Sequence, residues 1–384
     1  MNRLLVSALA LAFGAVSASA QSLDDLNIQI HGYATQGFLY TTQNNILTTS
    51  SSSGSPAWTE AVLNVGAEPI PKLRVGVQGR YFLLGNYGNT ITLDWAAGDY
   101  KVNDKFGVRF GKVKTPSGLF NDIQDIDPSY IWSLLPQSIY PISSRNSILA
   151  HYGGVVYGTL KLGQTMGKLE YRGFGGERSI GTDDGYFLAQ REAGIVLPNG
   201  LNRAIYGAAL HWKTPLRGLM VGASTIQNNA TAPEATKGTL VGVYSVHSFN
   251  QPNYFVQYER GKFMVAGEYG KTAPMVFTIF PGIPPIWRPL DNREWYGMAT
   301  YKLTGKLTAG LYDSQYFSKA VKLGPARYQK DWALAGRYDF NQYLYAKAEQ
   351  HWVDGTSIGY DVDLNPNGLK PTTKLTILKI GVSF

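Results

Sequence analysis

The fold is decided by the last eleven residues of the chain, 374–384, which read Lys-Leu-Thr-Ile-Leu-Lys-Ile-Gly-Val-Ser-Phe. Counting back from the terminal phenylalanine, every second residue is apolar: Val382, Ile380 and Leu378. The other face is mixed and carries Lys379 and Ser383. Because successive side chains of a β-strand point to opposite faces, this pattern predicts a half-buried strand at the very end of the chain.

The opposite end of the chain has the three parts of a secretory signal peptide. Arg3 supplies the positive start, residues 4–16 form an apolar run, and Ala-Ser-Ala at 18–20 is a small-residue cleavage site. The alternative is a transmembrane helix, but the run is too short to span a bilayer comfortably and no charged stop follows it. We therefore predict a signal peptide over residues 1–20 and a mature chain that begins at Gln21.

The composition excludes several classes of protein. The chain has no cysteine, so it has neither a disulfide framework nor a thiolate metal site. No other segment approaches an 18-residue apolar run, so no membrane-spanning helix is predicted. The chain nevertheless contains 43 Gly, 25 Tyr, 8 Trp and 16 Phe with only 16% charged residues. This balance fits a transmembrane β-barrel, in which lipid-facing residues alternate with pore-facing ones.

The chain is basic, with a formal net charge of +8. Cleavage of the signal removes Arg3 and leaves 34 basic against 27 acidic residues, or +7. Nucleic-acid binding is the alternative explanation for such a charge, but the basic residues lie singly along predicted strands and not in clusters. We predict no nucleic-acid partner, and we expect the positive excess to favour anionic solutes.

After Gln21 the sequence divides into segments of about ten residues with two-residue alternation, which is the pattern of a barrel. The predicted strands are 28–40, 57–68, 72–83, 89–100, 105–112, 148–162, 167–176, 203–213, 218–228, 251–259, 262–271, 293–303, 306–317, 329–338, 343–352 and 374–384. No linker or change of composition interrupts them. We therefore predict an all-β, antiparallel transmembrane barrel of about sixteen strands, formed by residues 21–384 as one domain.

The connections between these strands are alternately short and long, as expected for periplasmic turns and external loops. The long connections are 41–56, 113–147, 177–202, 229–250, 272–292, 318–328 and 353–373. The connection at 85–88 is an exception, because it should be external but is short. Residues 239–247 could be a further strand. A single-chain bacterial barrel has an even number of strands, so we place this segment within an external loop.

The two faces of each predicted strand differ in polarity. In 72–83, Val75 and Val77 lie on one face, whereas Gln78 and Arg80 lie on the other. A soluble antiparallel sheet with one wet face gives the same alternation. An arginine facing lipid near the bilayer midplane would cost about 2–4 kcal/mol, so we assign the apolar face to lipid and the polar face to the lumen.

The third external connection, 113–147, is the longest and has an unusual composition. It is rich in Ile, Leu, Phe, Tyr and Trp, whereas the solvated tip at 48–55 is mostly Ser and Thr. Loops longer than about 15 residues usually have a function or are disordered, and disorder does not suit so many apolar side chains. We expect this loop to fold against another part of the molecule, and the barrel interior is available.

With these features the chain resembles the porins of Gram-negative bacteria. The resemblance rests on about sixteen strands, on the C-terminal Phe384, on a long third loop, and on the strand-to-loop passage Phe-Gly-Val-Arg-Phe-Gly-Lys-Val-Lys-Thr-Pro-Ser-Gly-Leu-Phe at 106–120. It implies a water-filled channel for small hydrophilic solutes or ions in the bacterial outer membrane, among outer-membrane lipids. It also implies a homotrimer, a constriction formed by 113–147, and membrane insertion directed by Phe384.

General porins often oppose loop carboxylates to arginines of the barrel wall, and the resemblance implies such a site here. The candidate loop acids are Asp122, Asp125 and Asp127. The candidate wall bases on nearby strands are Arg74, Arg80 and Arg109. Charge rings of this kind set ion selectivity, and with the mature charge of +7 they suggest a mild anion preference. The alternative is that the acids only solvate the loop and the arginines line a wide lumen.

No motif for catalysis, a cofactor or a metal is found. The five histidines are scattered, and neither a nucleophile elbow nor a phosphate loop is present. Residues 361–368 resemble a calcium loop only faintly, because the glycine comes too late and the closing glutamate is missing. We predict a protein that is not an enzyme and needs no cofactor. An outer-membrane enzyme barrel of the phospholipase or protease type and a surface receptor or adhesin are the alternatives.

Overall fold

The structure is a computed structural model that describes residues 26–384, apart from 164, 183, 193 and 231–233. The predicted signal peptide, residues 1–20, and the predicted first mature residue, Gln21, lie outside the described residues. Within the described part of the chain, no helix is both long enough and apolar enough to cross a membrane.

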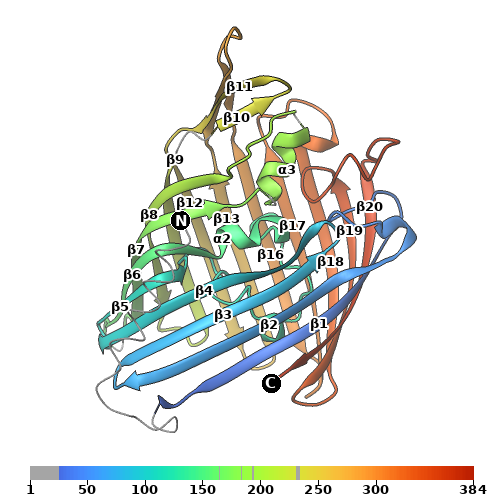
Figure 1. Cartoon of the computed structure of the whole chain (residues 1–384). Helices are drawn as coiled ribbons and strands as arrows, with labels where there is room; N and C mark the ends of the chain where they lie inside the picture. Colours follow the sequence, from blue (N-terminus) through green and yellow to red (C-terminus); the bar gives the residue numbers. More distant parts are fainter. Residues whose placement is uncertain (1–25, 164, 183, 193, 231–233) are drawn as a thin grey trace.

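Sixteen antiparallel strands form a closed barrel in which consecutive barrel strands are hydrogen-bonded neighbours (Figure 1). The strands are β1 (Gln29–Thr41), β2 (Ser55–Ile70), β3 (Leu73–Leu84), β4 (Tyr87–Asn103), β5 (Phe106–Lys114), β6 (Ala150–Lys161), β7 (Lys168–Ile180), β8 (Leu201–Lys213), β9 (Leu219–Ala230), β12 (Phe249–Arg260), β13 (Phe263–Thr272), β16 (Asn292–Lys302), β17 (Leu307–Ser318), β18 (Tyr328–Asp339), β19 (Leu344–Gly355) and β20 (Thr372–Ser383). Each predicted segment corresponds to one of these strands, which confirms the all-β barrel and its strand number.

The barrel closes where the last strand, β20, pairs antiparallel with β1. The pairing continues to the end of the chain: the Phe384 N–H donates to the Gly32 carbonyl at 3.0 Å, and the Gly32 N–H donates to the Phe384 carbonyl at 3.1 Å. A Cβ atom at Gly32 would lie 2.7 Å from the Val62 carbonyl oxygen and 2.8 Å from the Phe384 ring. Glycine at position 32 therefore leaves the space that the terminal ring occupies.

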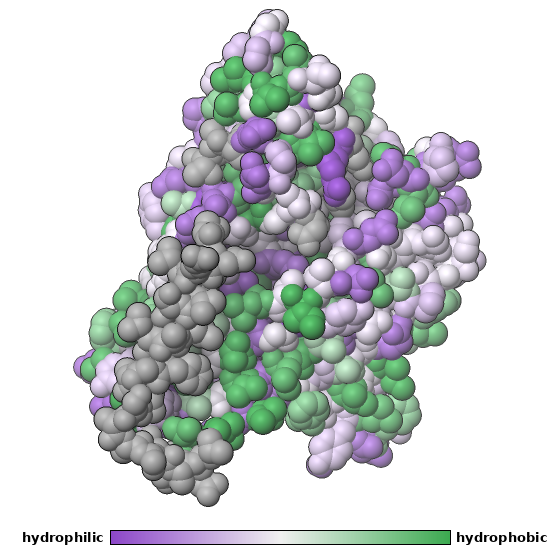
Figure 2. Space-filling view, viewed as in Figure 1, coloured by the Kyte–Doolittle hydropathy of each residue, from purple (hydrophilic) through white to green (hydrophobic). Residues whose placement is uncertain are grey.

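The two faces of the barrel wall differ as the alternation predicts. On β3, Val75 and Val77 are 41% and 42% exposed, whereas Gln78 and Arg80 are only 3% and 1% exposed. Other barrel strands also expose large hydrophobic side chains, among them Phe38 of β1, Leu210 of β8 and Leu378 of β20. Figure 2 shows hydrophobic side chains gathered over the strands in the lower middle of the view. The outer wall is therefore apolar, and polar side chains of the strands are turned inward.

Two long connections combine into a second, four-stranded sheet outside the barrel, with the order β10-β11-β14-β15 (Figure 1). The β9–β12 connection supplies β10 (Glu234–Lys237) and β11 (Leu240–Val246), and the β13–β16 connection supplies β14 (Met275–Ile279) and β15 (Ile286–Pro289). A buried cluster beneath it includes Phe187 of α3 (Gly185–Glu192). Residues 239–247 are thus confirmed as part of a structured connection and not of the barrel.

We predict that Gly32→Val weakens barrel closure, because the added side chain overlaps the Val62 carbonyl and the Phe384 ring. Overpacking of this kind costs about 1–3 kcal/mol. The measurement is the fraction of refolded protein that keeps the faster mobility of a folded barrel on an unheated gel. Gly79→Val on β3 is the matched control, since a Cβ there meets nothing within 4 Å. Equal yields for the two variants would contradict this account of the closure.

Candidate pore constriction

The longest connection between consecutive barrel strands joins β5 to β6 and packs against the inner face of the wall. It contains η3 (Asp127–Ser129), η4 (Ile142–Ser144) and α2 (Arg145–Ile148). Its apolar side chains share one buried cluster with inward side chains of β13, β16, β17 and β18. The cluster consists of Phe120, Ile131, Trp132, Leu135 and Tyr140 of the connection, with Ala266, Tyr296, Met298, Tyr312, Ala333 and Ala335 of the wall.

Asp127 fixes the middle of this connection to the last two strands. Its carboxylate accepts hydrogen bonds from the Tyr345 hydroxyl at 2.7 Å and from Lys379 Nζ at 2.6 Å, and Lys347 Nζ lies 3.0 Å away. Lys347 also donates to the backbone carbonyls of Asp127 and Trp132, at 2.7 and 2.9 Å. Burial raises the pKa of the Asp127 carboxyl, but the two ammonium groups outweigh burial and hold this pKa below its ordinary value.

A second carboxylate binds the backbone of the same segment. Glu349 of β19 accepts hydrogen bonds from the backbone N–H groups of Ser133 and Leu134, the latter at 3.2 Å. His351 lies between two acids, with Nε2 at 3.1 Å from the Glu349 carboxylate and Nδ1 at 3.0 Å from the Asp331 carboxylate. All of these side chains are buried. The backbone here is therefore held by a buried chain of ionisable groups on β18 and β19.

A third carboxylate, Glu268 of β13, binds the connection from another part of the barrel wall. The Tyr140 hydroxyl lies 2.8 and 2.9 Å from the two Glu268 carboxylate oxygens. The Tyr296 hydroxyl donates to the same carboxylate at 2.7 Å, and the Leu119 N–H donates to it at 3.2 Å. Residues near the two ends of the connection thus share one buried acceptor.

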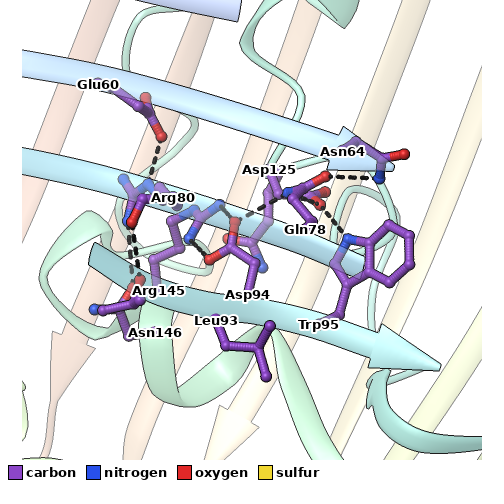
Figure 3. Close-up of polar contacts among 12 residues, drawn as sticks. Glu60, Asn64, Gln78, Arg80, Leu93, Asp94, Trp95, Asp125, Arg145 and Asn146 are labelled. Atoms are coloured by element: carbon purple, nitrogen blue, oxygen red, sulfur yellow. Dashed lines mark hydrogen bonds and ion pairs between the residues drawn. The ribbon is translucent and has the colours of Figure 1, made fainter. Parts of the chain in front are cut away.

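Both ends of the connection are also tied to β3 and β4 (Figure 3). Arg145 donates two hydrogen bonds of 2.8 Å to the Asp94 carboxylate, which is the bidentate geometry that suits a guanidinium. Lys114 Nζ lies 2.7 Å from Asp125 Oδ1. Gln78 links the two pairs, since its amide donates to Asp125 at 2.8 Å and to Asp94 at 3.0 Å.

Arg80, Asp125 and Asp127 of the predicted site lie in this buried region. The Arg80 guanidinium is 2.6 Å from Glu60 Oε1 and donates to Asn146 Oδ1 at 3.2 Å (Figure 3). Asp125 and Asp127 are 0% and 2% exposed. Two of the predicted acids and one predicted base therefore lie in the same region. They do not pair with one another: Arg80 pairs with Glu60, and the two aspartates pair with lysines.

Arg74, Arg109 and Asp122 of the predicted site lie instead along a cavity of about 580 Å³. They too are ion-paired, with Glu68, Asp99 and Arg172 respectively. Among the described residues, none of the three loop aspartates forms an ion pair with any of the three predicted arginines.

Most of the charged residues that hold the connection were not among the predicted site residues. They include Asp94, Arg145, Glu268, Lys347, Glu349 and Lys379. For Lys347 and Lys379 a signal was present, because alternation places them on the inward faces of β19 and β20. Arg145 lies in a loop without periodicity, so its direction could not be inferred from sequence spacing.

The barrel resembles solved outer-membrane proteins. Salmonella typhi OmpF in complex with daunomycin gives a TM-score of 0.59 at 12% identity, covering 95% of this chain and 99% of that one. An anion-selective porin from Comamonas acidovorans gives 0.57 at 9%, covering 93% and 99%. Outer-membrane expressed OmpT of Vibrio cholerae gives 0.57 at 12%, covering 95% and 100%.

No family model and no curated protein matches the sequence. At identities this low the structural likeness establishes the fold alone. The chain therefore has the fold of a sixteen-stranded outer-membrane porin.

We predict that Asp127→Asn loosens the connection between β5 and β6. The change leaves two buried ammonium groups without their carboxylate, and breaking a buried ion pair from one side costs about 3–5 kcal/mol. Hydrogen–deuterium exchange of the backbone amides of residues 127–135 should become faster. Asp122→Asn is the control, because Asp122 and its partner Arg172 are partly exposed. Exchange that stays at the wild-type rate in Asp127→Asn would show that this ion pair does not hold the segment.

Proposed function

We propose that this chain is a bacterial outer-membrane porin that lets small hydrophilic solutes and ions diffuse through a water-filled channel. One observation carries the proposal: a closed sixteen-stranded barrel has an apolar outer wall and an inner wall with many charged side chains. An apolar outer wall suits lipid, and a charged inner wall suits water and dissolved ions. The likeness of the fold to solved outer-membrane proteins supports the same function.

We further propose that residues 113–147 form the constriction of this channel. The buried contacts with β13 and β16–β20, together with the ties to β3 and β4, support a loop that crosses the barrel interior. Between the loop and the wall of β2 and β3, the structure has a cavity of only about 30 Å³. In this proposal the narrow part of the path lies beside this gap, and the 580 Å³ cavity that Arg74, Arg109 and Asp122 line belongs to a wider vestibule.

A mild preference for anions is the selectivity that the charges favour. Five charged side chains line the narrow cavity, three of them basic and two acidic: Arg80, Arg145, Lys379, Glu60 and Asp127. Selectivity follows the charges at the narrowest ring, so an excess of one positive charge favours anions slightly.

One of the similar solved structures is an in-vitro folded OmpT of Vibrio cholerae in a trimer form. We propose a trimer for this chain as well.

Single-channel recording in planar bilayers tests the proposed function. Wild-type protein should form open channels. In a salt gradient their reversal potential should have the sign of a channel that is weakly selective for anions. Deletion of residues 119–135 should raise the conductance, because it removes the segment that Asp127 and Glu349 hold within the barrel. Deletion of residues 361–368 in the β19–β20 connection is the control. A wild-type barrel that does not conduct would favour the enzyme or receptor alternative, and an unchanged conductance after the first deletion would place the loop outside the path.

A further inference from the structure

A basic patch lies on the outer wall of the barrel, beside the long connections at the ends of β16, β17 and β18 (Figure 1). We call it the outer basic patch. Its four basic and two acidic side chains give it a net charge of +2. The members are Arg293, Lys319, Arg327 and Lys330, with Asp291 and Asp354.

The pairing of β13 with β16 shows that Arg293 faces outward. Glu268 and Tyr296 lie opposite each other on these strands, and Glu268 binds the β5–β6 connection inside the barrel. Side chains alternate along a strand, so Tyr269 and Arg293 lie on the other, outer face. Arg293 Nη1 lies 3.1 Å from the Tyr269 hydroxyl, which confirms that the two side chains share this face.

Three of the cations are neighbours on this outer face. The Asp291 carboxylate accepts hydrogen bonds from Nε and Nη2 of Arg293 at 2.8 and 3.1 Å, and Lys319 Nζ lies 3.4 Å away. Phe317 is opposite Arg293 in the register, and the Arg327 guanidinium lies 4.4 Å from the centre of the Phe317 ring. One carboxylate therefore lies among three cations that come from β16 and from both ends of the β17–β18 connection.

The patch continues onto β18 and β19. Tyr328 pairs with Phe317 and shares its outer face. Lys330 Nζ lies 5.4 Å from the centre of the Tyr328 ring, and the Tyr328 hydroxyl lies 3.0 Å from Asp354 Oδ1. The basic side chains are thus supported by aromatic rings of the outer wall, which favours their positions through cation–π attraction.

Nearer the middle of the same strands, the outer face is aromatic and then aliphatic. Trp332 and Trp352 pair across β18 and β19, and Leu311 and Leu334 pair across β17 and β18. All four side chains are exposed. Tryptophan gathers at the headgroup level of a membrane, and aliphatic side chains face the acyl chains. The outer basic patch therefore lies at the headgroups of the outer leaflet, next to a wall that suits acyl chains.

A lipid with a phosphate headgroup matches both parts of this surface. A phosphomonoester carries about −1.5 to −2 charges at pH 7, which balances the net charge of the patch. The contacts of Arg293 with Asp291 and Tyr269 use three of the five N–H donors of a guanidinium, so Arg293 can bind a further acceptor. Arginine and lysine are the usual ligands of phosphate.

We propose that the outer basic patch binds a phosphomonoester-bearing lipid of the outer leaflet. The phosphate lies on the patch, and the acyl chains lie along the wall that Leu311 and Leu334 form. Free phosphate matches only the charged part of this surface. Binding of the lipid does not require a conducting channel, so it is independent of the proposed porin function.

Native mass spectrometry of the full barrel in detergent tests the patch, because it resolves each bound lipid by its mass. The probes are phosphatidic acid, which carries a phosphomonoester, and phosphatidylcholine with the same acyl chains. Phosphatidic acid should bind more tightly, since phosphatidylcholine has no net charge. The triple variant Lys319→Gln, Arg327→Gln, Lys330→Gln should weaken this binding about a hundredfold, because each basic residue near an anionic lipid surface contributes about fivefold.

The matched control removes the same number of charges at the other ends of neighbouring strands. Lys262, Lys302 and Lys306 are exposed beside the short turns of β13, β16 and β17. The triple variant Lys262→Gln, Lys302→Gln, Lys306→Gln should keep the wild-type affinity for phosphatidic acid. The faster mobility of a folded barrel on an unheated gel verifies that both variants are folded before they are compared.

Several outcomes would overturn the proposal. Equal affinities for the two lipids, or an unchanged affinity in the variant of the outer basic patch, would show that the patch does not recognise the phosphate. Displacement of phosphatidic acid by inorganic phosphate at equal concentration would show a site for free phosphate and not for a lipid. A change in the number of copies per assembly with no change in lipid affinity would show a contact between copies of the chain.

Discussion

The pairing of β20 with β1 is the constraint on which the rest of the structure depends. A sheet with sixteen strands that did not close would leave two rows of unpaired backbone groups, and closure removes both edges. The ladder runs to the last residue, where Phe384 exchanges two hydrogen bonds with Gly32. Closure also separates the side chains of every strand into an outer and an inner set, because they alternate along the strand. The apolar outer wall and the charged inner wall are consequences of that single closure.

The inner wall is itself asymmetric, and this asymmetry accounts for the position of the β5–β6 connection. On β13, β16, β17 and β18 the inward residues against the loop include small or apolar side chains such as Ala266, Met298, Ala333 and Ala335. The loop rests its apolar side chains on this half. On β19, β20, β3 and β4 the wall carries Lys347, Lys379, Gln78 and Asp94, which bind carboxylates, a guanidinium and backbone of the loop. The apolar half of the wall buries the apolar side chains of the loop. The charged half fixes the position of the loop along the wall.

The strands could be predicted from the sequence because the signal is local. Two-residue alternation and the regular change between short and long connections are both properties of neighbouring residues. The ion-pair partners that hold the β5–β6 connection are not local: Lys379 and Asp127 are 252 positions apart. Alternation could place Lys379 on the inward face, but only the closure of the barrel brings β20 near the loop. Asp125 and Asp127 are paired with lysines, whereas Asp122 is paired with Arg172, which is not one of the three arginines expected.

The second sheet was missed for a related reason. Its strands have four to seven residues, and they come from two connections that are separated in the sequence by β12 and β13. Only the segment around β11 was long enough to suggest a strand. Pairing of β11 with β14 joins the two connections across that gap, and nothing in either segment alone indicates it.

The β5–β6 connection is held against the inner wall of the barrel, and one of its contacts with β17 allows a direct test. Ser138 of this connection and Ser314 of β17 have hydroxyl oxygens 2.9 Å apart. Because the chain has no cysteine, the double variant Ser138→Cys, Ser314→Cys can be oxidised without competing thiols. A disulfide should form in nearly all of the folded protein, as measured by thiol labelling after unfolding. Ser138→Cys combined with Gln315→Cys, on the opposite face of β17, should form none. Free thiols at 138 and 314 in a fully folded barrel would show that the connection does not lie against β17.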